Sequence, residues 1–190
     1  MITRFLIKRK MFLRTIIALI LCYVCIVVMG DNATEYLSPV LNRPKKFPNR
    51  FSFAGKTYYV DSVFKTNFFK AVQFCRLQGM QLWAINNNEE DARMVKFLQE
   101  KGLDHRRYWT SGANLGDRDQ WVWLSTGLDV IYANWPPGQP SYSYNGKEEN
   151  CIEYRGWGGT PNGFAINDMD CMAEFYFICE SSNDCANCWN

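Results

Sequence analysis

Few side chains in this 190-residue chain are suited to covalent catalysis. His105 is the only histidine, and it lies between Asp104 and Arg106 in a polar stretch that is typical of a solvated loop. A Ser-His or Cys-His catalytic pair would have to use this residue, and no serine lies in a nucleophile motif. Zinc would need ligands that disulfides are expected to consume. We therefore expect a protein that is not an enzyme.

Most of the cysteines predict disulfide bonds. An even number in an exported chain is typical of a disulfide framework, although the spacing alone leaves many pairings open. Six cysteines follow the apolar N-terminal segment: Cys75, Cys151, Cys171, Cys179, Cys185 and Cys188.

Cys185 and Cys188 form a C-x-x-C pair near the C-terminus. Redox catalysis by such a pair would need a helix N-terminus in a thioredoxin-like unit, and that context is missing. A Cys185–Cys188 disulfide and a bridge to a second chain both fit the pair. A disulfide-linked or non-covalent dimer is therefore open, and an exported redox protein is the least favoured hypothesis.

Residues 1–30 have the pattern of a secretory signal peptide. Five basic residues flank the start of an apolar run from Ile16 to Met29, and the small residue Gly30 follows this run. The run is shorter than the roughly 20 residues that a membrane span needs. A signal anchor, with the rest of the chain outside, is the alternative. We expect a secreted protein with no stable membrane insertion after cleavage.

Removal of this segment changes the charge of the chain. The remaining 16 basic and 19 acidic residues give a formal charge of −3, so no nucleic-acid partner is expected. Residues 31–50 are polar and contain prolines, as in a linker, and Asn32 begins a glycosylation sequon. About 160 residues remain, which suits one domain with its own core.

The first predicted helix carries a cysteine on its inner face. Phe68, Ala71, Val72 and Cys75 follow helical spacing, and Gly79 is a plausible stop. This spacing turns Cys75 toward the core.

A second helix is expected to begin near Asn88, with Asp91 as its capping-box-like partner, and to end at Gly102. Its predicted inner face consists of Met94, Val95 and Leu98.

Beyond the second helix the sequence predicts short strands and long loops. Strands are expected at Lys56–Val60 and Phe175–Cys179, while residues 125–172 are poor in regular structure. Such a long irregular segment needs a functional site, bound ions or cross-links to explain it. The predicted fold class is α+β. Four tryptophans are expected in the core: Trp109, Trp121, Trp123 and Trp135.

The order of these features resembles that of the C-type lectin-like domain family. Within that family, the sequence is most similar in overall character to the secreted lectins of insects. The matching segments are Cys75, YWTSGANL at 108–115, WVW at 121–123, NWPPGQPS at 134–141, ENC at 149–151, INDMDC at 166–171 and FICE at 177–180. The resemblance implies a domain over residues 51–181, with a Cys-containing tail at 182–190. It also implies two helices, small antiparallel sheets, a long loop region and the disulfides Cys75–Cys179 and Cys151–Cys171.

The resemblance further implies a Ca²⁺ site. Calcium is a hard cation that takes about 6 to 8 oxygen ligands, and amide and carboxylate groups suit it. An ion held in this way has open positions that two adjacent sugar hydroxyls can fill. The implied residues, which would hold both the ion and the sugar, are Gln139, Ser141, Glu149, Asn167 and Asp168.

The tripeptide around Pro140 bears on specificity. Gln-Pro-Asp accompanies galactose-type sugars in the family and Glu-Pro-Asn accompanies mannose-type sugars, so Gln139 favours galactose. Ser141 offers only a neutral hydroxyl where the family has Asn or Asp. Tyr142 and Tyr144 either stack on a sugar ring or pack within the loop. The expected partners are glycans or glycoproteins, and the alternative is a lectin-like interaction protein that binds another surface without Ca²⁺.

Overall fold

The computed structural model describes residues 48–132, 134–160 and 163–182. These residues form two helices, α2 (Phe68–Leu77) and α3 (Asn88–Glu100). The strands are β1 (Arg50–Phe53), β2 (Lys56–Val60), β3 (Gln81–Leu82), β4 (Arg107–Ala113), β5 (Val122–Trp123), β6 (Leu128–Asp129), β7 (Ser143–Tyr144), β8 (Lys147–Glu148), β9 (Cys151–Gly156), β10 (Phe164–Met169) and β11 (Tyr176–Ser182). The α+β prediction is confirmed.

Both helices begin at an asparagine. The side chain of Asn67 accepts a hydrogen bond from the Lys70 backbone N–H at 3.0 Å and caps α2. Asn87 caps α3 in the same way by accepting from the Glu90 backbone N–H at 2.9 Å. The expected start of α3 near Asn88 is confirmed, but its capping residues are Asn87 and Glu90, each one position before the expected pair of Asn88 and Asp91.

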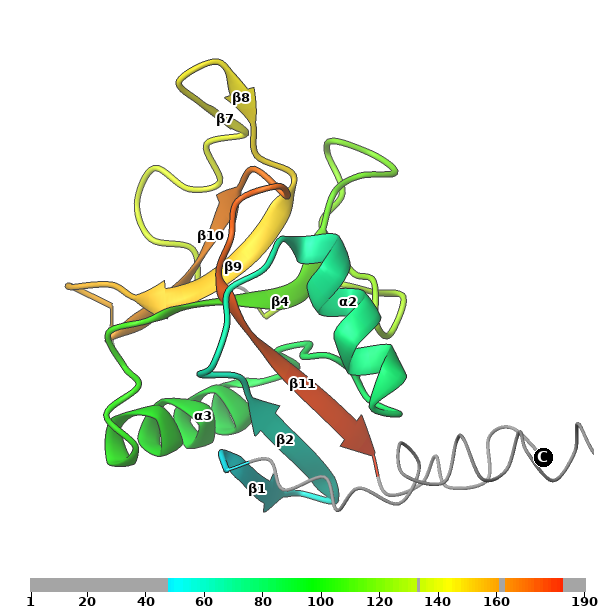
Figure 1. The fold of residues 1–190 in the computed structure, drawn as a ribbon. Coiled ribbons are helices and arrows are strands. Elements are labelled where there is room, and N and C mark those ends of the chain that lie inside the picture. The colour runs from blue at the N-terminus through cyan, green and yellow to red at the C-terminus, as the bar shows by residue number, and fades with distance from the viewer. Residues whose placement is uncertain (1–47, 133, 161–162, 183–190) are drawn as a thin grey trace, which may run out of the picture. The chain divides into compact units, whose positions relative to one another are not determined.

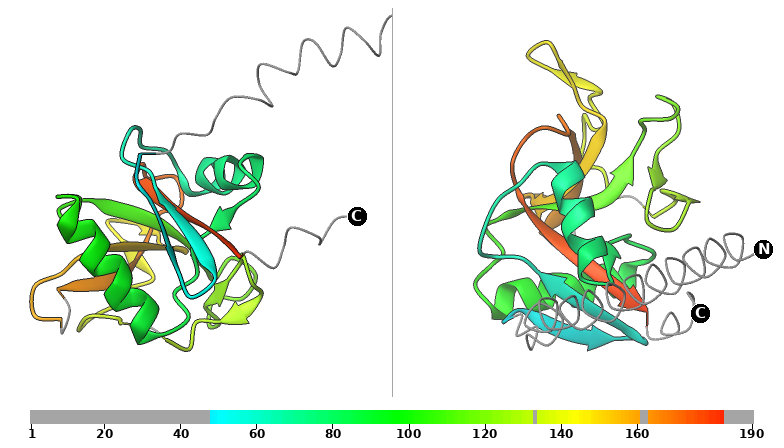
Figure 2. Two further views of the ribbon diagram at one scale, coloured as in Figure 1. Left: turned by 90° about the horizontal axis from the view of Figure 1, so that it is seen from below. Right: turned by 45° about the vertical axis from the view of Figure 1, so that its right-hand side comes forward.

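The last strand, β11, joins the two halves of the main sheet. It pairs with β2 in antiparallel orientation and with β4 in parallel orientation. It begins one residue later than expected and continues three residues beyond Cys179. Figures 1 and 2 show α2 and α3 on opposite sides of this strand.

The irregular segment predicted for residues 125–172 is wrong in its second half. β9 and β10 pair over six residues each, from Phe164 opposite Gly156 to Met169 opposite Cys151. β9 also pairs with β4 on its other edge. Glu153 and Arg155 interrupt the apolar pattern of β9, which is why no strand was predicted there.

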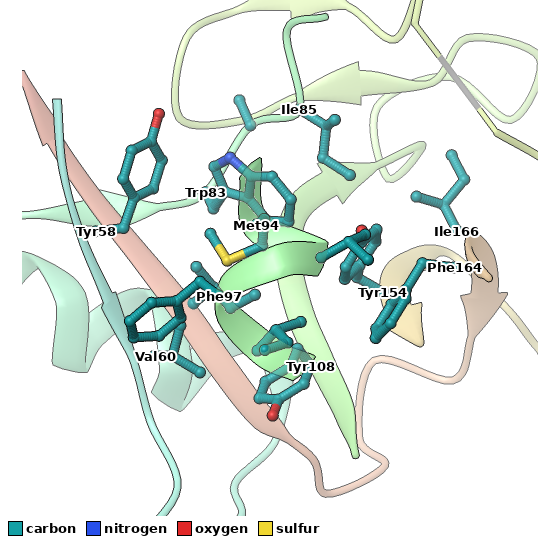
Figure 3. Close-up of a cluster of buried hydrophobic side chains, with 14 of the residues drawn as sticks. Tyr58, Val60, Trp83, Ile85, Met94, Phe97, Tyr108, Tyr154, Phe164 and Ile166 are labelled. Carbon is teal, nitrogen blue, oxygen red and sulfur yellow. The ribbon is translucent and has the colours of Figure 1, made fainter. Parts of the chain in front are cut away.

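The apolar core has two parts. The larger one packs α3 against the sheet, and Figure 3 shows Met94 of α3 next to Trp83. The smaller one lies under α2 and contains both disulfides. Of the four tryptophans expected in the core, Trp109 and Trp123 are buried, whereas Trp121 and Trp135 are only partly buried at its edge.

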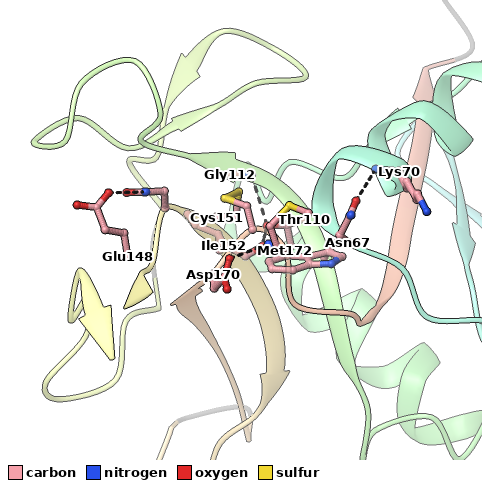
Figure 4. Close-up of a disulfide and its surroundings, with 12 residues drawn as sticks. Asn67, Lys70, Thr110, Gly112, Glu148, Cys151, Ile152, Asp170 and Met172 are labelled. Carbon is pink, nitrogen blue, oxygen red and sulfur yellow. Dashed lines mark hydrogen bonds between the residues drawn. A yellow bond between two sulfur atoms is a disulfide. The ribbon is translucent and has the colours of Figure 1, made fainter. Parts of the chain in front are cut away.

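Two disulfides tie distant parts of the chain together. Cys75 on α2 is bonded to Cys179 on β11, with a sequence separation of 104 residues. Cys151 at the start of β9 is bonded to Cys171 after β10, with a separation of 20 residues (Figure 4). These are the pairs that the resemblance implies.

No helix in the ranges described above has the length and apolar character needed to cross a membrane. Several expectations lie outside the described residues, namely the signal peptide, most of the linker with Asn32, and the cysteines of the tail at Cys185 and Cys188.

Candidate functional site

The residues implied for the site come from a loop and from two paired strands. Gln139 and Ser141 lie in the loop between β6 and β7, and the Gln139–Pro140 peptide bond is cis. Glu149 lies two residues before β9, while Asn167 and Asp168 lie within β10. The pairing of β9 with β10 therefore brings Glu149 to the strand end that lies nearest the loop.

Asp168 fixes the loop to the sheet. Its carboxylate accepts hydrogen bonds from the backbone N–H groups of Ser141 at 3.0 Å and Tyr142 at 2.6 Å. Asp168 itself is fully buried, whereas the loop residues that donate to it are partly or fully exposed. This contact joins residues 26 and 27 positions apart and sets the loop against β10.

Glu149 is tied to the same loop. The Ser141 hydroxyl donates to one carboxylate oxygen of Glu149 at 2.7 Å, and the Glu149 backbone N–H donates to the Tyr142 carbonyl at 3.1 Å. The Ser141 hydroxyl therefore acts here as a donor toward Glu149. Its lone pairs stay available as a weak, neutral ligand.

Two buried amide oxygens at the site have no hydrogen-bond partner. They are Oδ1 of Asn167 and Oε1 of Gln139. The opposite end of the Asn167 amide is bonded, because its nitrogen donates to Glu153 at 3.0 Å and to the Asp168 carbonyl at 2.8 Å. A buried acceptor without a partner costs about 1–3 kcal/mol. A cation coordinated by both oxygens would remove that cost.

The structure adds Glu153 to the site, which the sequence analysis missed. Glu153 is fully buried on β9 opposite Asn167, and its other contacts are charged. Arg107 on β4 donates to Glu153 through Nε and through Nη2, the latter at 2.6 Å. The sequence signal was an acid inside an apolar stretch just after Cys151, and its partner lies 46 residues away.

Negative charge accumulates around Glu149. Burial raises the pKa of Glu149, and the carboxylates of Asp168 and Glu153 raise it further. The hydrogen bond from Ser141 and the charge of Arg107 act in the opposite direction. The site thus holds carboxylates close together with too little positive charge nearby to balance them.

This donor set fits a hard cation better than zinc. Within the described residues, no three His, Cys, Asp or Glu side chains are grouped as a metal site. The candidate set instead has two carboxylates, Glu149 and Asp168, with two amide oxygens and a hydroxyl. Such mixed oxygen donors are typical of Ca²⁺ sites.

The two tyrosines differ in exposure. Tyr142 is half-buried, its ring centroid lies 6.2 Å from that of Trp121, and the Arg118 guanidinium lies 5.8 Å away. Tyr144 on β7 is 67% exposed. Tyr142 is therefore a packing residue of the loop, whereas the ring of Tyr144 is accessible.

Comparison with known proteins gives one consistent result. The family model described as the lectin C-type domain matches residues 64–181. C-type lectin 37Db of Drosophila melanogaster is 32% identical over 133 residues, which cover 70% of this chain and 83% of that protein. C-type lectin mosGCTL-7 of Aedes aegypti is 24% identical, covering 70% of this chain and 87% of that protein.

A solved structure agrees with these relatives. The carbohydrate-recognition domain of human scavenger receptor C-type lectin aligns with a TM-score of 0.58 and 28% identity, over 72% of this chain and 98% of that one. The relatives support a carbohydrate-binding role without catalysis. With its family match, its two helices around the β11 sheet and its two disulfides, this chain belongs to the C-type lectin family.

Proposed function

We propose that this chain is a secreted lectin that binds galactose-type sugars through one Ca²⁺ ion. The observation that carries the proposal is the pair of buried, unbonded amide oxygens on Gln139 and Asn167. They accompany two carboxylates, Glu149 and Asp168, that the loop already ties together through Ser141 and Tyr142. Buried polar atoms normally have partners, and a cation is the partner that suits several oxygens at once.

The ion would be held by Gln139, Glu149, Asn167 and Asp168, with Ser141 as a neutral fifth donor. When bound, it would offer open coordination positions to two neighbouring sugar hydroxyls. The carboxylates and amides of the same residues can hydrogen-bond those hydroxyls, because each has more than one acceptor or donor site. No bond in the sugar would be made or broken.

Two features support galactose-type sugars. Gln139 occupies the position that accompanies galactose in the family. Tyr144 presents an accessible ring on the β7–β8 hairpin, next in sequence to the loop of the site. Such a ring suits the apolar face of a galactose-like sugar. Mannose-type sugars are the less favoured specificity.

The remaining chain organisation is part of the proposal. We assign residues 1–30 to a cleaved signal, 31–50 to a linker, 51–181 to the lectin domain and 182–190 to a tail. Asn32 is proposed as a glycosylation site, and Cys185 and Cys188 as a local disulfide or a link to a second chain. Mass spectrometry of the protein collected from culture medium would test all three assignments.

The decisive test uses columns of immobilised galactose and immobilised mannose, in Ca²⁺ and in EDTA. We expect retention on galactose in Ca²⁺, elution by EDTA and weaker retention on mannose. Asn167→Ala should abolish retention, whereas Asn88→Ala at an exposed position on α3 should keep it. If neither sugar retains the protein in Ca²⁺, the proposal is refuted. Stronger retention on mannose than on galactose would refute the proposed galactose specificity.

One observation favours a second function. The Ser141 hydroxyl is bonded to Glu149, so the position where the family has Asn or Asp provides no further strong ligand. The alternative is a lectin-like interaction protein that binds another surface without Ca²⁺. Calorimetric titration separates the two functions, because saturable Ca²⁺ binding that is lost in Asp168→Ala supports the first and no heat of binding supports the second.

A further inference from the structure

Basic side chains gather around a second cleft, which contains none of the proposed Ca²⁺ ligands and shares with their surroundings only Arg107, through its contact with Glu153. It has a volume of about 350 Å³ and lies where β4 and β11 begin. The residues that line it are Lys65, His105, Arg106, Arg107, Phe175 and Tyr176. The segment around His105 that the sequence alone indicated as a solvated loop therefore forms one wall of a binding-sized cleft.

Aromatic rings hold the cationic groups of this cleft in place. The Arg106 guanidinium carbon lies 4.5 Å from the ring centroid of Tyr176, and that of Arg107 lies 4.0 Å from Phe175. Lys65 Nζ lies 5.5 Å from the Tyr176 centroid. Arg106 also donates to the Ser62 carbonyl at 2.8 Å. A cation fixed in this way loses less conformational entropy when it binds an anion.

The positive charge of the cleft is only partly balanced. Arg107 forms an ion pair with Glu153, and Arg155, its partner across the β4–β9 ladder, lies 3.9 Å from the same carboxylate. Among the described residues, neither Lys65 nor Arg106 lies within ion-pair distance of a carboxylate. This excess stands out in a chain that has more acids than bases after residue 30.

We propose that this cleft binds a sulfated saccharide and does so without Ca²⁺. Guanidinium groups present several N–H donors in a fixed plane, which matches the oxygens of a sulfate ester. The volume of the cleft suits a short part of a sugar chain, and the chain belongs to a carbohydrate-binding family. Neighbouring sulfates along a saccharide would meet Lys65 and Arg106 together.

The test measures binding of a sulfated heparin hexasaccharide to the full chain by calorimetry in EDTA. The same titration uses an unsulfated hexasaccharide of the same backbone. We expect saturable binding of the sulfated sugar alone, and weaker binding above about 0.1 M salt because exposed charges are then screened. Lys65→Gln/Arg106→Gln should bind about tenfold more weakly, since two charge-assisted contacts are lost.

The control variant is Lys70→Gln/Arg76→Gln, which removes the same two charges from exposed positions on α2. It should bind as the unchanged protein does. Because Arg106 also donates to the Ser62 carbonyl, the single variant Lys65→Glu at an exposed position gives a second measurement that leaves this hydrogen bond intact.

Three results would overturn the proposal. They are equal losses in the cleft and control variants, equal affinity for the unsulfated sugar, and binding that requires Ca²⁺. Asn167→Ala should leave this binding unchanged while it abolishes the proposed Ca²⁺-dependent binding. Failure of one proposal can therefore be told from failure of the other.

Discussion

The carboxamide of Asn167 is held so that its oxygen stays free. Its nitrogen donates to Glu153 and to the Asp168 carbonyl, and these two bonds decide which end of the amide faces each neighbour. Glu153 in turn is held by Arg107 from a different strand. The oxygen that we assign to Ca²⁺ is thus oriented in part by Glu153 and Arg107, which are not among the proposed ligands. Such supporting contacts commonly affect metal affinity strongly.

We predict that Glu153→Gln weakens Ca²⁺ binding by about 10- to 100-fold. If the glutamine side chain introduced at position 153 directs its oxygen to Arg107, its NH₂ group faces the side-chain nitrogen of Asn167. Two hydrogen-bond donors then face each other. Asn167 would rotate to relieve this conflict, which would move its oxygen away from the ion. Calorimetric titration with Ca²⁺ measures the loss.

The matched control for this prediction is Glu148→Gln. Glu148 is exposed next to Glu149, and its carboxylate contacts Arg118 and the Asn150 side-chain amide, each at 3.4 Å, so the variant removes the same charge near the site without touching Asn167. Its Ca²⁺ affinity should change by less than about threefold, because exposed pairs contribute little. Equal losses in both variants would mean that net charge, rather than orientation, controls the affinity.

The five proposed ligands were predicted from the sequence because they lie in the short motifs that contain Pro140, Cys151 and Cys171. Glu153 could not be predicted, since its role depends on Arg107, which lies 46 residues away. A charge inside an apolar stretch gives no sign of its partner until the strands are paired. The available oxygens on Gln139 and Asn167 likewise appear only in the folded chain.

At the level of secondary structure, α2 and the start of α3 followed from the sequence pattern, whereas the residue that caps α3 did not. Three asparagines in a row, Asn86 to Asn88, can each cap a helix, and the pattern alone does not choose between them. In the structure Asn87 is the cap, and the Glu90 side chain reaches back to the residue that precedes this cap. One Glu90 oxygen accepts from the Asn86 backbone N–H at 2.9 Å.

We predict that Asn87→Ala lowers the free energy of unfolding by about 1 kcal/mol, because the Glu90 N–H loses its cap. Asn88→Ala removes only an exposed contact with the Tyr132 hydroxyl at 3.1 Å and should cost less than about half as much. Urea unfolding of both variants measures the difference. The larger loss in Asn88→Ala would place the cap one residue later.

β9 and β10 show why other elements were missed. Their inner residues include Glu153, Asn167 and Asp168, so neither strand reads as apolar alternation. Their burial is stabilised by hydrogen bonds, because Glu153 accepts from Asn167 and Arg107 across the sheet and the Asp168 carboxylate accepts from the N–H groups of the loop. The buried polar residues that prevented the prediction of these strands are therefore the same residues that form or support the proposed site.

Lys56 connects three elements through one ammonium group. It lies 2.9 Å from Glu90 on α3 and 2.8 Å from Glu180 on β11, and both carboxylates are buried. Tyr58 on β2 also donates to Glu90. Lys56 is the only cation that these two acids share among the described residues. Its removal would leave two buried carboxylates close together.

We predict that Lys56→Met lowers the free energy of unfolding at pH 7 by about 2–3 kcal/mol. The estimate is below the range for fully buried pairs because Lys56 is 26% exposed. Denaturant unfolding measures the loss. Lys96→Met, which breaks an exposed pair with Glu100, is the control and should cost under about 0.5 kcal/mol.

The pH dependence of this variant has a definite sign. Burial raises the pKa of Glu180, while Lys56 opposes that rise. Hydrogen bonds from Tyr58, the Asn86 N–H and Lys56, with the charge of Lys56, lower the pKa of Glu90 despite burial. Without Lys56 both values rise, so the folded variant binds protons more readily than the unfolded chain. Its stability should increase as the pH falls from 7 toward 5, and a further decrease would contradict the assignment.

At the scale of the whole molecule, the two disulfides perform different tasks. Both lie in the smaller core cluster under α2. Cys75–Cys179 joins the first helix to the last strand and spans most of the domain. Cys151–Cys171 closes only the segment that contains β9 and β10, and Figure 4 shows it near Asp170 and Ile152 at the ends of those strands. One bond secures the fold, and the other secures the base of the site.

This division predicts different losses for the two pairs. Cys75→Ala/Cys179→Ala should cost about 4–5 kcal/mol of unfolding free energy, because the closed loop is long, and Cys151→Ala/Cys171→Ala about 3 kcal/mol. The Ca²⁺ affinity should respond in the opposite order. Glu149 lies two residues before Cys151 and Asp168 three before Cys171, so only the second variant loosens the ligands. Measured in conditions where both variants stay folded, an equal or larger loss of Ca²⁺ affinity in the Cys75 variant would show that the site depends on the whole fold and not on its local bridge.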